Sequence, residues 1–178
     1  ADESAVNAMI ARCVNELGQL DVLVNNAGTT HFIDHANLDG VTDKVWDDIL
    51  GVNPKGTFYC CRAALPHLQK TGGSIVNVTS VAGLQGHGSS IPYAASKAAV
   101  NGFIRALAVE LGAQGILANA LCPGYIDTDL TRQNNSPEQL AAIAQTIPLG
   151  RLGTPQEMAK LAVWLCSGQN TYLTGQAL

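Results

Sequence analysis

Tyr93 and Lys97 are the two residues of this sequence whose types and spacing most directly suggest chemistry. They stand four residues apart in a segment with helical periodicity, where such side chains are neighbours. A phenol with a pKa of about 10 is a poor proton donor or base at neutral pH. A nearby ammonium and the positive end of a helix both favour the phenolate, so we expect the pKa of Tyr93 to be lowered. The pair is therefore a candidate acid–base centre.

Ser80 stands thirteen residues before Tyr93 and closes an apolar run at residues 74–79. Such a short continuous run is typical of a buried parallel strand. A glycine-rich connection at residues 83–88 follows it. Ser80 is thus expected at the carboxyl end of a strand, which is the edge where open α/β sheets bind ligands. This placement favours a functional interpretation of the nearby tyrosine and lysine.

The elements that must position these residues alternate along the chain. Apolar runs predict strands at residues 20–24, 74–79 and 116–121, and helical periodicity predicts helices at 3–17, 43–69, 93–112, 137–146 and 155–167. Strand and helix in alternation indicate crossover units. We therefore expect an α/β fold with a doubly wound parallel sheet. No repeat or linker divides the chain, so residues 1–178 are expected to form one domain.

The helix expected at residues 93–112 has two apolar faces. One face carries Tyr93 and Lys97 together with the apolar residues that would pack on the sheet. The opposite face is uncharged and is formed by Ala95, Gly102, Ala106 and Val109. A helix that is apolar on both sides is buried on both sides. We expect the second face to contact another subunit; the alternative is a further helix of the same chain.

Pro54 lies inside the helical pattern at residues 43–69. Proline lacks the N–H that a helix interior needs, so a kink is expected there. Proline also disfavours the α conformation at the residue before it, which is Asn53. The kink would free a backbone carbonyl for a bound water. The alternative is two shorter helices with a polar joint.

Composition narrows the classes of partner. Ten Lys and Arg against 14 Asp and Glu give a net charge of −4, which argues against nucleic-acid binding and leaves no basic arm for a membrane. No apolar run approaches the roughly 20 residues that cross a bilayer. The five cysteines show no metal-ligand spacing, so we expect no metal site and reduced thiols in a cytoplasmic protein.

Several motifs, taken in order, resemble the short-chain dehydrogenase/reductase family over essentially the whole chain. They are Asn25-Asn26-Ala27-Gly28, Asn53, Ser80, the Tyr93/Lys97 pair and Pro123-Gly124-Tyr125-Ile126-Asp127-Thr128. The resemblance implies a Rossmann-like fold and an NAD- or NADP-dependent oxidoreductase that interconverts a secondary alcohol and a ketone by hydride transfer. It also implies a homodimer or homotetramer. The 3-oxoacyl carrier-protein reductases are as similar as any other branch.

The resemblance also implies a role for each site residue. Tyr93 would exchange the proton of the substrate oxygen, and Ser80 would hydrogen-bond that oxygen. Lys97 would lower the pKa of the tyrosine and hold the nicotinamide ribose, while Asn53 would anchor a water that joins the lysine to solvent. The residues implied to contact the cofactor are Asn25, Ala27, Gly28, Tyr93, Lys97, Pro123, Gly124, Ile126 and Thr128.

The glycine-rich turn that holds the pyrophosphate in this family does not occur in the sequence. We therefore expect a partial, N-terminally truncated Rossmann-like domain, in which residues 20–24 form an exposed apolar edge. The choice between NAD and NADP is not encoded in these residues. The alternative function is a non-catalytic fragment that retains the oligomer interface. A modest ketone or a 3-oxoacyl chain fits the segment at residues 129–147, and sugars and polyols are also compatible.

Overall fold

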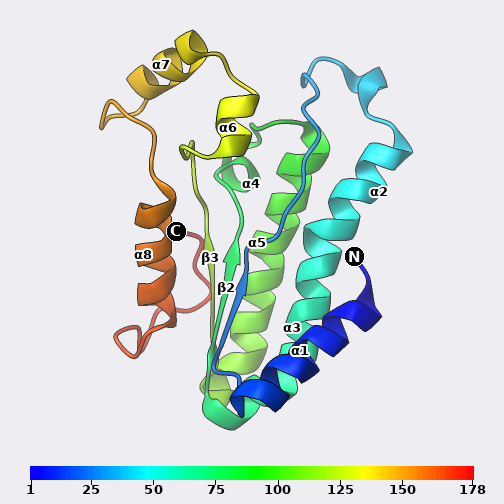
Figure 1. Ribbon diagram of the computed structural model, residues 1–178, viewed down its shortest axis with the longest axis vertical. Helices are drawn as coiled ribbons and strands as arrows, with labels where there is room; N and C mark the ends of the chain where they lie inside the picture. Colours follow the sequence, from blue (N-terminus) through cyan, green and yellow to red (C-terminus); the bar gives the residue numbers. More distant parts are fainter.

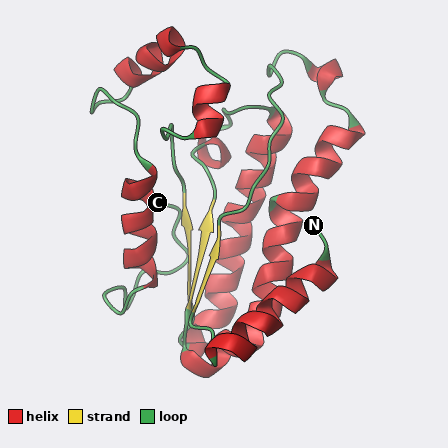
Figure 2. Cartoon of the chain, viewed as in Figure 1, coloured by secondary structure: helices red, strands yellow, loops and turns green.

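A parallel sheet of three strands lies at the centre of the chain in the computed structural model, which describes residues 1–178 (Figures 1 and 2). The strands are β1 (Val22–Asn25), β2 (Ser74–Val78) and β3 (Leu117–Leu121), and they lie in the order β1-β2-β3. Val24 is opposite Val76, and Val76 is opposite Asn119. The predicted α/β fold with a parallel sheet is confirmed.

Helices cover both faces of this sheet, as a doubly wound fold requires. They are α1 (Glu3–Leu17), α2 (Asp43–Val52), α3 (Pro54–Thr71), α4 (Ala82–Gln85), α5 (Ile91–Leu111), α6 (Asp129–Gln133), α7 (Pro137–Thr146) and α8 (Pro155–Cys166), with short 3-10 helices at Leu38–Gly40 and Gly112–Gln114. Helices α3 and α5 pack on one face and α8 on the other, while α1 lies against α3 (Figure 1). None of these helices combines the length and apolar character needed to cross a membrane.

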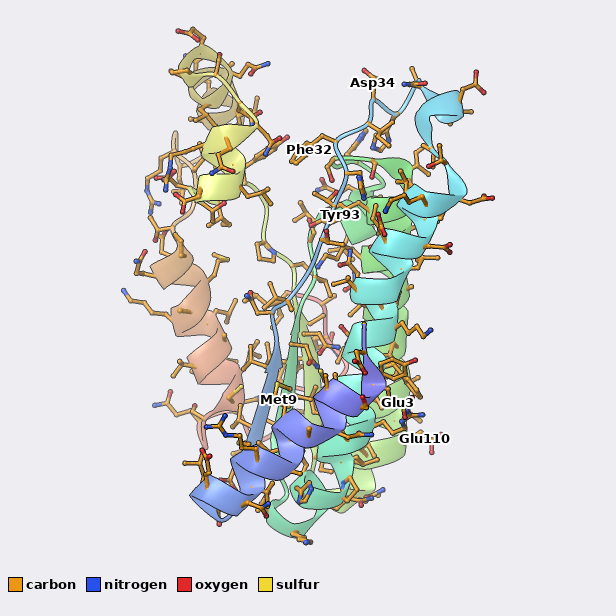
Figure 3. The ribbon with its side chains drawn as sticks, turned by 45° about the vertical axis from the view of Figure 1, so that its right-hand side comes forward. Glu3, Met9, Phe32, Asp34, Tyr93 and Glu110 are labelled. Carbon is orange, nitrogen blue, oxygen red and sulfur yellow. The ribbon has the colours of Figure 1, made fainter.

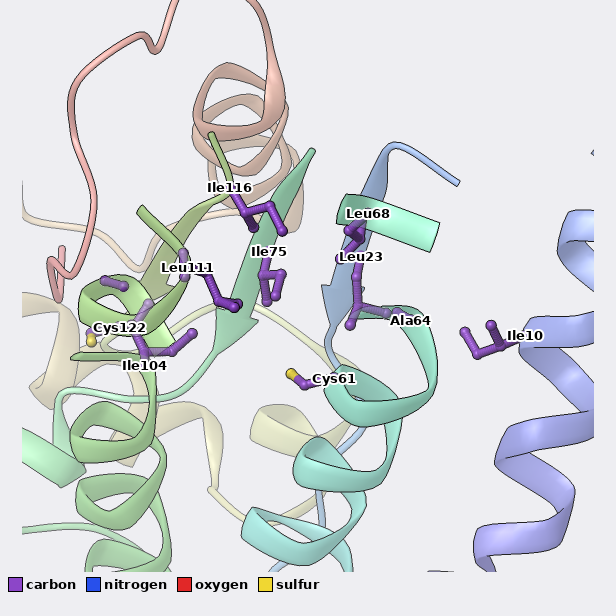
Figure 4. Close-up of a cluster of buried hydrophobic side chains, with 13 residues drawn as sticks. Ile10, Leu23, Cys61, Ala64, Leu68, Ile75, Ile104, Leu111, Ile116 and Cys122 are labelled. Carbon is purple, nitrogen blue, oxygen red and sulfur yellow. The ribbon is translucent and has the colours of Figure 1, made fainter. Parts of the chain in front are cut away.

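The larger hydrophobic core lies between the sheet and helices α3 and α5 (Figure 4). Leu23, Ile75 and Ala118 are in register across the three strands and face this core. Leu68 of α3 and Ile104 of α5 are almost completely buried against them. Burying a side chain of this size contributes about 1.5 to 3 kcal/mol each. This core holds α5, and with it Tyr93 and Lys97, on the sheet.

The ends of α1 and α8 follow from local capping. Asp2 accepts hydrogen bonds from the Ser4 and Ala5 backbone N–H groups, and Gly18 ends α1 with a φ of +86°. At α8 the Thr154 side chain accepts from the Glu157 N–H, while the Glu157 carboxylate accepts from the Thr154 N–H. Such caps satisfy backbone groups that the helix leaves unpaired. Both helices accordingly begin at the residue that the sequence predicts.

Pro54 divides the predicted helix at residues 43–69 into α2 and α3, so the two-helix alternative is the one observed. The joint is Asn53, which has φ −67° and ψ −69°. The expectation that Asn53 would leave the α region was therefore wrong. Its N–H still donates to the Ile49 carbonyl at 2.9 Å, and this helical hydrogen bond keeps the backbone in the α region.

Two apolar surfaces stay exposed in the chain. Strand β1 is at the edge of the sheet, and Val24 is 45% exposed, which confirms the predicted apolar edge. The outer face of α5 is also exposed, with Val109 at 80%. Within residues 1–178 no helix covers this face, so the predicted subunit contact stays a prediction.

Candidate active site

The predicted catalytic residues meet at the carboxyl ends of the strands, beside the N-terminus of α5. Ser80 follows β2, Tyr93 lies in the first turn of α5 and Lys97 lies one turn further on. In Figure 3, Tyr93 lies near the upper end of α5, below the loop that follows β1. Asn53 reaches the same region from the joint between α2 and α3. Residues separated by up to 44 positions in the sequence thus share one site.

Lys97 is a buried cation, only 6% exposed. Its Nζ donates a hydrogen bond to the carbonyl oxygen of Val78, the last residue of β2, at 3.0 Å. Burial disfavours the charged form of an amine. It lowers the pKa of Lys97 from 10.5 to about 8. The lysine can therefore change its protonation near neutral pH.

Tyr93 is half-buried, and its ring centre lies 5.6 Å from the Lys97 Nζ. Burial raises the pKa of the phenol, and an interaction with the Ser80 hydroxyl opposes that rise. The expected lowering of the pKa of Tyr93 is thus not what this arrangement gives. The physical reason is that the Lys97 ammonium is directed at Val78, while the phenol has lost much of its contact with water.

Asn53 is almost completely buried, at 2% exposure, and all its side-chain polar atoms are paired. Its Oδ1 accepts from the Thr29 N–H at 2.8 Å, and its Nδ2 donates to the Thr29 carbonyl at 3.0 Å. The same Nδ2 donates to the Ser96 hydroxyl at 2.9 Å. Asn53 therefore joins the loop after β1 to helix α5.

The residues from Asn25 to Gly28 contribute to the site in two ways. The Asn25 side chain donates to Asn77 Oδ1 at 2.8 Å on the side of α3, so it fastens β1 to β2. Gly28 lies close to Lys97 and Asn53. A Cβ placed on Gly28 would be 3.4 Å from the Lys97 Nζ and 3.4 Å from Asn53 Oδ1. Glycine therefore leaves space next to the lysine.

A groove of about 420 Å³ lies between α8 and the ends of the strands, and it shares Val78, the hydrogen-bond acceptor of Lys97, with the site. Its walls include Pro123, Ile126 and Thr128 of the predicted cofactor segment, together with Asn26. Gly124 has open space beside it, so a ligand can approach its backbone closely. Apolar walls with a few polar groups suit a flat aromatic ring that carries a carboxamide. The residues present therefore fit a nicotinamide.

Comparison with known proteins agrees with this geometry. The family model described as enoyl-(acyl carrier protein) reductase matches residues 1–178. A putative ketoacyl reductase of the granaticin polyketide synthase from Streptomyces violaceoruber is 42% identical over 180 residues, covering 100% of this chain and 71% of that protein. The 3-oxoacyl-acyl-carrier-protein reductase FabG of Thermotoga maritima is 38% identical, covering 99% and 71%.

Solved structures give the same result. A putative short-chain dehydrogenase/reductase from Burkholderia xenovorans superposes with a TM-score of 0.90 and 35% identity, covering 99% of this chain and 70% of the other. ElxO with NADP bound superposes with a TM-score of 0.91 and 37% identity, covering 99% and 72%. The chain belongs to the short-chain dehydrogenase/reductase family. The expected enzyme class, an NAD(P)-dependent oxidoreductase, is confirmed with it.

Two features of this short-chain dehydrogenase/reductase site were not predicted from the sequence. Gly83 lies so close to α5 that a Cβ there would be 2.6 Å from the Lys97 carbonyl carbon. The glycines at residues 83–88 were a signal of such close approach, but not of which helix they meet. The second feature is the buried Ser96, whose partner Asn53 is 43 residues away. No local sequence pattern could have indicated that contact.

Proposed function

We propose that this chain carries the reaction centre of an NAD(P)-dependent enzyme that interconverts a secondary alcohol and a ketone, with Tyr93 as the acid and base. The observation that carries the proposal is the convergence of a phenol, a hydroxyl and a buried ammonium where β2 ends and α5 begins. Ser80, Tyr93 and Lys97 supply these groups. Convergent polar groups with perturbed pKa values, next to an apolar groove, are typical of an active site.

Tyr93 suits the role of proton donor in the reductive direction. Because burial raises its pKa, the phenol is protonated at neutral pH. It can give its proton to a carbonyl oxygen as negative charge develops there. The Ser80 hydroxyl, which interacts with Tyr93, can donate a second hydrogen bond to the same oxygen. Together they would hold the carbonyl in one orientation.

Lys97 would restore the proton that Tyr93 gives up. Its pKa of about 8 allows the ammonium to release a proton near neutral pH. Once the tyrosine is a phenolate, the adjacent ammonium also stabilises that negative charge. We therefore assign Lys97 two tasks, charge stabilisation at Tyr93 and a hydrogen bond to the ribose of the coenzyme. Asn53 would keep the lysine connected to solvent through a bound water.

A nicotinamide coenzyme, NAD or NADP, would supply or accept the hydride when bound. The residues that would hold it are Ala27, Gly28, Pro123, Gly124, Ile126 and Thr128, with Tyr93 and Lys97 at the reacting end. Asn25 would support them from the sheet through Asn77. Because the similar ElxO structure holds NADP, we propose NADP as the first coenzyme to test.

A 3-oxoacyl chain is the substrate class that we propose. The similar proteins from Streptomyces and Thermotoga are named as ketoacyl and 3-oxoacyl reductases. In this chain, α6 and α7 rise above the ends of the strands opposite the loop after β1 (Figure 1). Leu130 of α6 is 55% exposed, and Phe32 projects from that loop on the side that faces α6 (Figure 3). Apolar side chains on both sides suit an acyl chain.

The test is the oxidation of NADPH and of NADH, followed at 340 nm, by the purified protein with a 3-oxoacyl thioester, a cyclic ketone and a ketose. We expect turnover of the thioester above that of the ketose. Turnover of none of the three would favour the alternative, a non-catalytic fragment. We do not favour that alternative, because Ser80, Tyr93 and Lys97 converge in this chain and the similar proteins are reductases. In the proposed enzyme, residues 1–178 would form one partial Rossmann-like domain.

A further inference from the structure

A chain of hydrogen bonds runs through Ser96, which lies between Tyr93 and Lys97 on α5. Ser96 is completely buried. Its hydroxyl donates to the Tyr93 carbonyl at 2.7 Å and accepts from Asn53 Nδ2 at 2.9 Å. Because a serine has one hydroxyl hydrogen, that hydrogen goes to the Tyr93 carbonyl and the oxygen accepts from Asn53. The first turn of α5 is thereby fixed to the side chain of Asn53.

Asn53 continues this connection to the backbone of Thr29. Its Oδ1 and Nδ2 bind the N–H and the carbonyl of that one residue, at 2.8 and 3.0 Å. Two hydrogen bonds to a single residue define its orientation as well as its distance. Since the Asn53 side chain is buried, loss of one partner would leave a polar group without water to replace it. The connection from α5 to Thr29 is therefore stiff.

Thr29 directly follows Gly28, the glycine that lies against the lysine. The position of a Cβ on Gly28, 3.4 Å from the Lys97 Nζ, shows how little room separates the loop from the ammonium. A shift of Thr29 relative to α5 would move Gly28 with it and admit water to the lysine. The hydration of Lys97 is what sets its pKa. Ser96 can thus act on Lys97 without touching it.

We propose that Ser96 is a positioning residue for the Tyr93 and Lys97 pair, because its hydroxyl holds the Thr29 backbone in place through Asn53. The proposal rests on the proposed function only for the reaction that Tyr93 and Lys97 carry out. The hydrogen-bonded connection itself can be tested without any turnover. Ser96 does not line the groove, and its hydroxyl bonds to the Tyr93 backbone and the Asn53 side chain and not to the phenol or the ammonium, so we assign it no part in the proton transfer.

Ser90 provides a matched control within the same helix end. Like Ser96 it is completely buried, and it precedes the first residue of α5. Unlike Ser96, its hydroxyl has no hydrogen-bond partner. Replacing either serine by alanine removes one buried oxygen from the N-terminal part of α5 or the residue before it. Only Ser96→Ala breaks the connection to Thr29.

The first measurement is amide hydrogen exchange of the full chain, read at Thr29. Its N–H is held by Asn53, so we expect Ser96→Ala to speed the exchange roughly tenfold. Ser90→Ala should leave the rate at Thr29 within about a factor of two of the wild type. Equal rates at Thr29 in the wild type and in Ser96→Ala would overturn the proposal. If Ser96→Ala does not fold, Ser96→Cys, which keeps a weak donor, serves in its place and should give a smaller increase.

The second measurement is an NMR titration of Lys97 with labelled lysine. We expect the pKa of Lys97 to rise toward its ordinary value in Ser96→Ala, since water reaches the ammonium, and to stay unchanged in Ser90→Ala. An unchanged pKa of Lys97 in Ser96→Ala would show that the serine only packs, and would overturn the proposal. Absence of ketone turnover by the wild type would instead contradict the proposed function. The two failures are thus distinguished by separate measurements.

Discussion

The Nζ of Lys97 lies 5.6 Å from the centre of the Tyr93 ring, one helical turn away. A cation over an aromatic face is attracted to it, and the attraction is larger where water is excluded. The lysine nevertheless donates a hydrogen bond to the Val78 carbonyl. Because burial also raises the pKa of Tyr93, the phenol stays protonated until it gives its proton to a substrate. In the proposed reaction this favours proton donation to a ketone.

Tyr93→Phe should reduce ketone turnover at least about a hundredfold, because it removes only the hydroxyl that exchanges the proton. Coenzyme binding should be nearly unchanged, since the ring is retained. Steady-state kinetics and coenzyme titration by fluorescence measure the two effects. Tyr172→Phe, at a tyrosine that is 93% exposed, is the matched control and should keep full activity. Near-normal turnover by Tyr93→Phe would exclude the tyrosine as the acid.

Lys97→Met should change how stability depends on pH. Burial lowers the pKa of Lys97 from 10.5 to about 8, so between these values the unfolded chain binds more protons than the folded one. The free energy of unfolding of the wild type should therefore rise with pH over this window, relative to Lys97→Met, by about 3 kcal/mol in total. Urea denaturation at pH 7.5, 9 and 10.5 gives the difference.

The comparison isolates the lysine because Tyr93 is present in both proteins. A tyrosine with a raised pKa acts in the opposite sense, and only above its ordinary value of 10. Parallel stability curves for the wild type and Lys97→Met between pH 8 and 10.5 would show that the ammonium is not buried in solution.

Gly83→Ala should destabilise the protein by about 2 kcal/mol or more, because the new methyl group meets helix backbone that cannot move aside. A Cβ there would be 2.6 Å from the Lys97 carbonyl carbon and 2.7 Å from the Ala98 nitrogen. The midpoint of urea unfolding measures the loss. Gly168→Ala is the control, since a Cβ at that exposed glycine meets nothing within 4 Å. Equal midpoints for the two variants would contradict the close approach of α4 to α5.

Gly102→Glu should weaken self-association. Gly102 lies on the exposed apolar face of α5, between Ala95 and Val109, and has open space around it in the single chain. If two copies pack through this face, one substitution places two carboxylates in the same apolar contact, which is costly. We expect sedimentation velocity to show a smaller species than for the wild type, and no change for Gly168→Glu. A wild type that sediments as a monomer at every concentration would contradict an interface here.

Helix and strand positions were predictable where local chemistry defines them. Helix α7 covers Pro137–Thr146 as expected, because Ser136 and Gln139 form reciprocal cap hydrogen bonds before an apolar pattern. Helices α4 and α6 were not expected, because four or five residues are too few to show a period. The conformation of Asn53 was also missed, since the helical hydrogen bond from its N–H to the Ile49 carbonyl overrode the preference imposed by Pro54.

The members of the site could be predicted more fully than their electrostatics. Spacing alone places Tyr93 and Lys97 on one side of α5. It does not say that the Lys97 ammonium turns to a strand carbonyl 19 residues earlier, or that burial shifts the pKa of both groups. Side-chain direction and burial arise only when the sheet and helix are packed together.

The proline that follows Asn53 also bears on the chemical durability of the site. Asparagine side chains age by deamidation when the next backbone nitrogen attacks the amide carbon to form a cyclic imide. That attack requires an N–H, which Pro54 lacks. The same residue that divides α2 from α3 therefore blocks this route for Asn53. The amide nitrogen that donates to Ser96 and Thr29 is protected by covalent structure and not by burial alone.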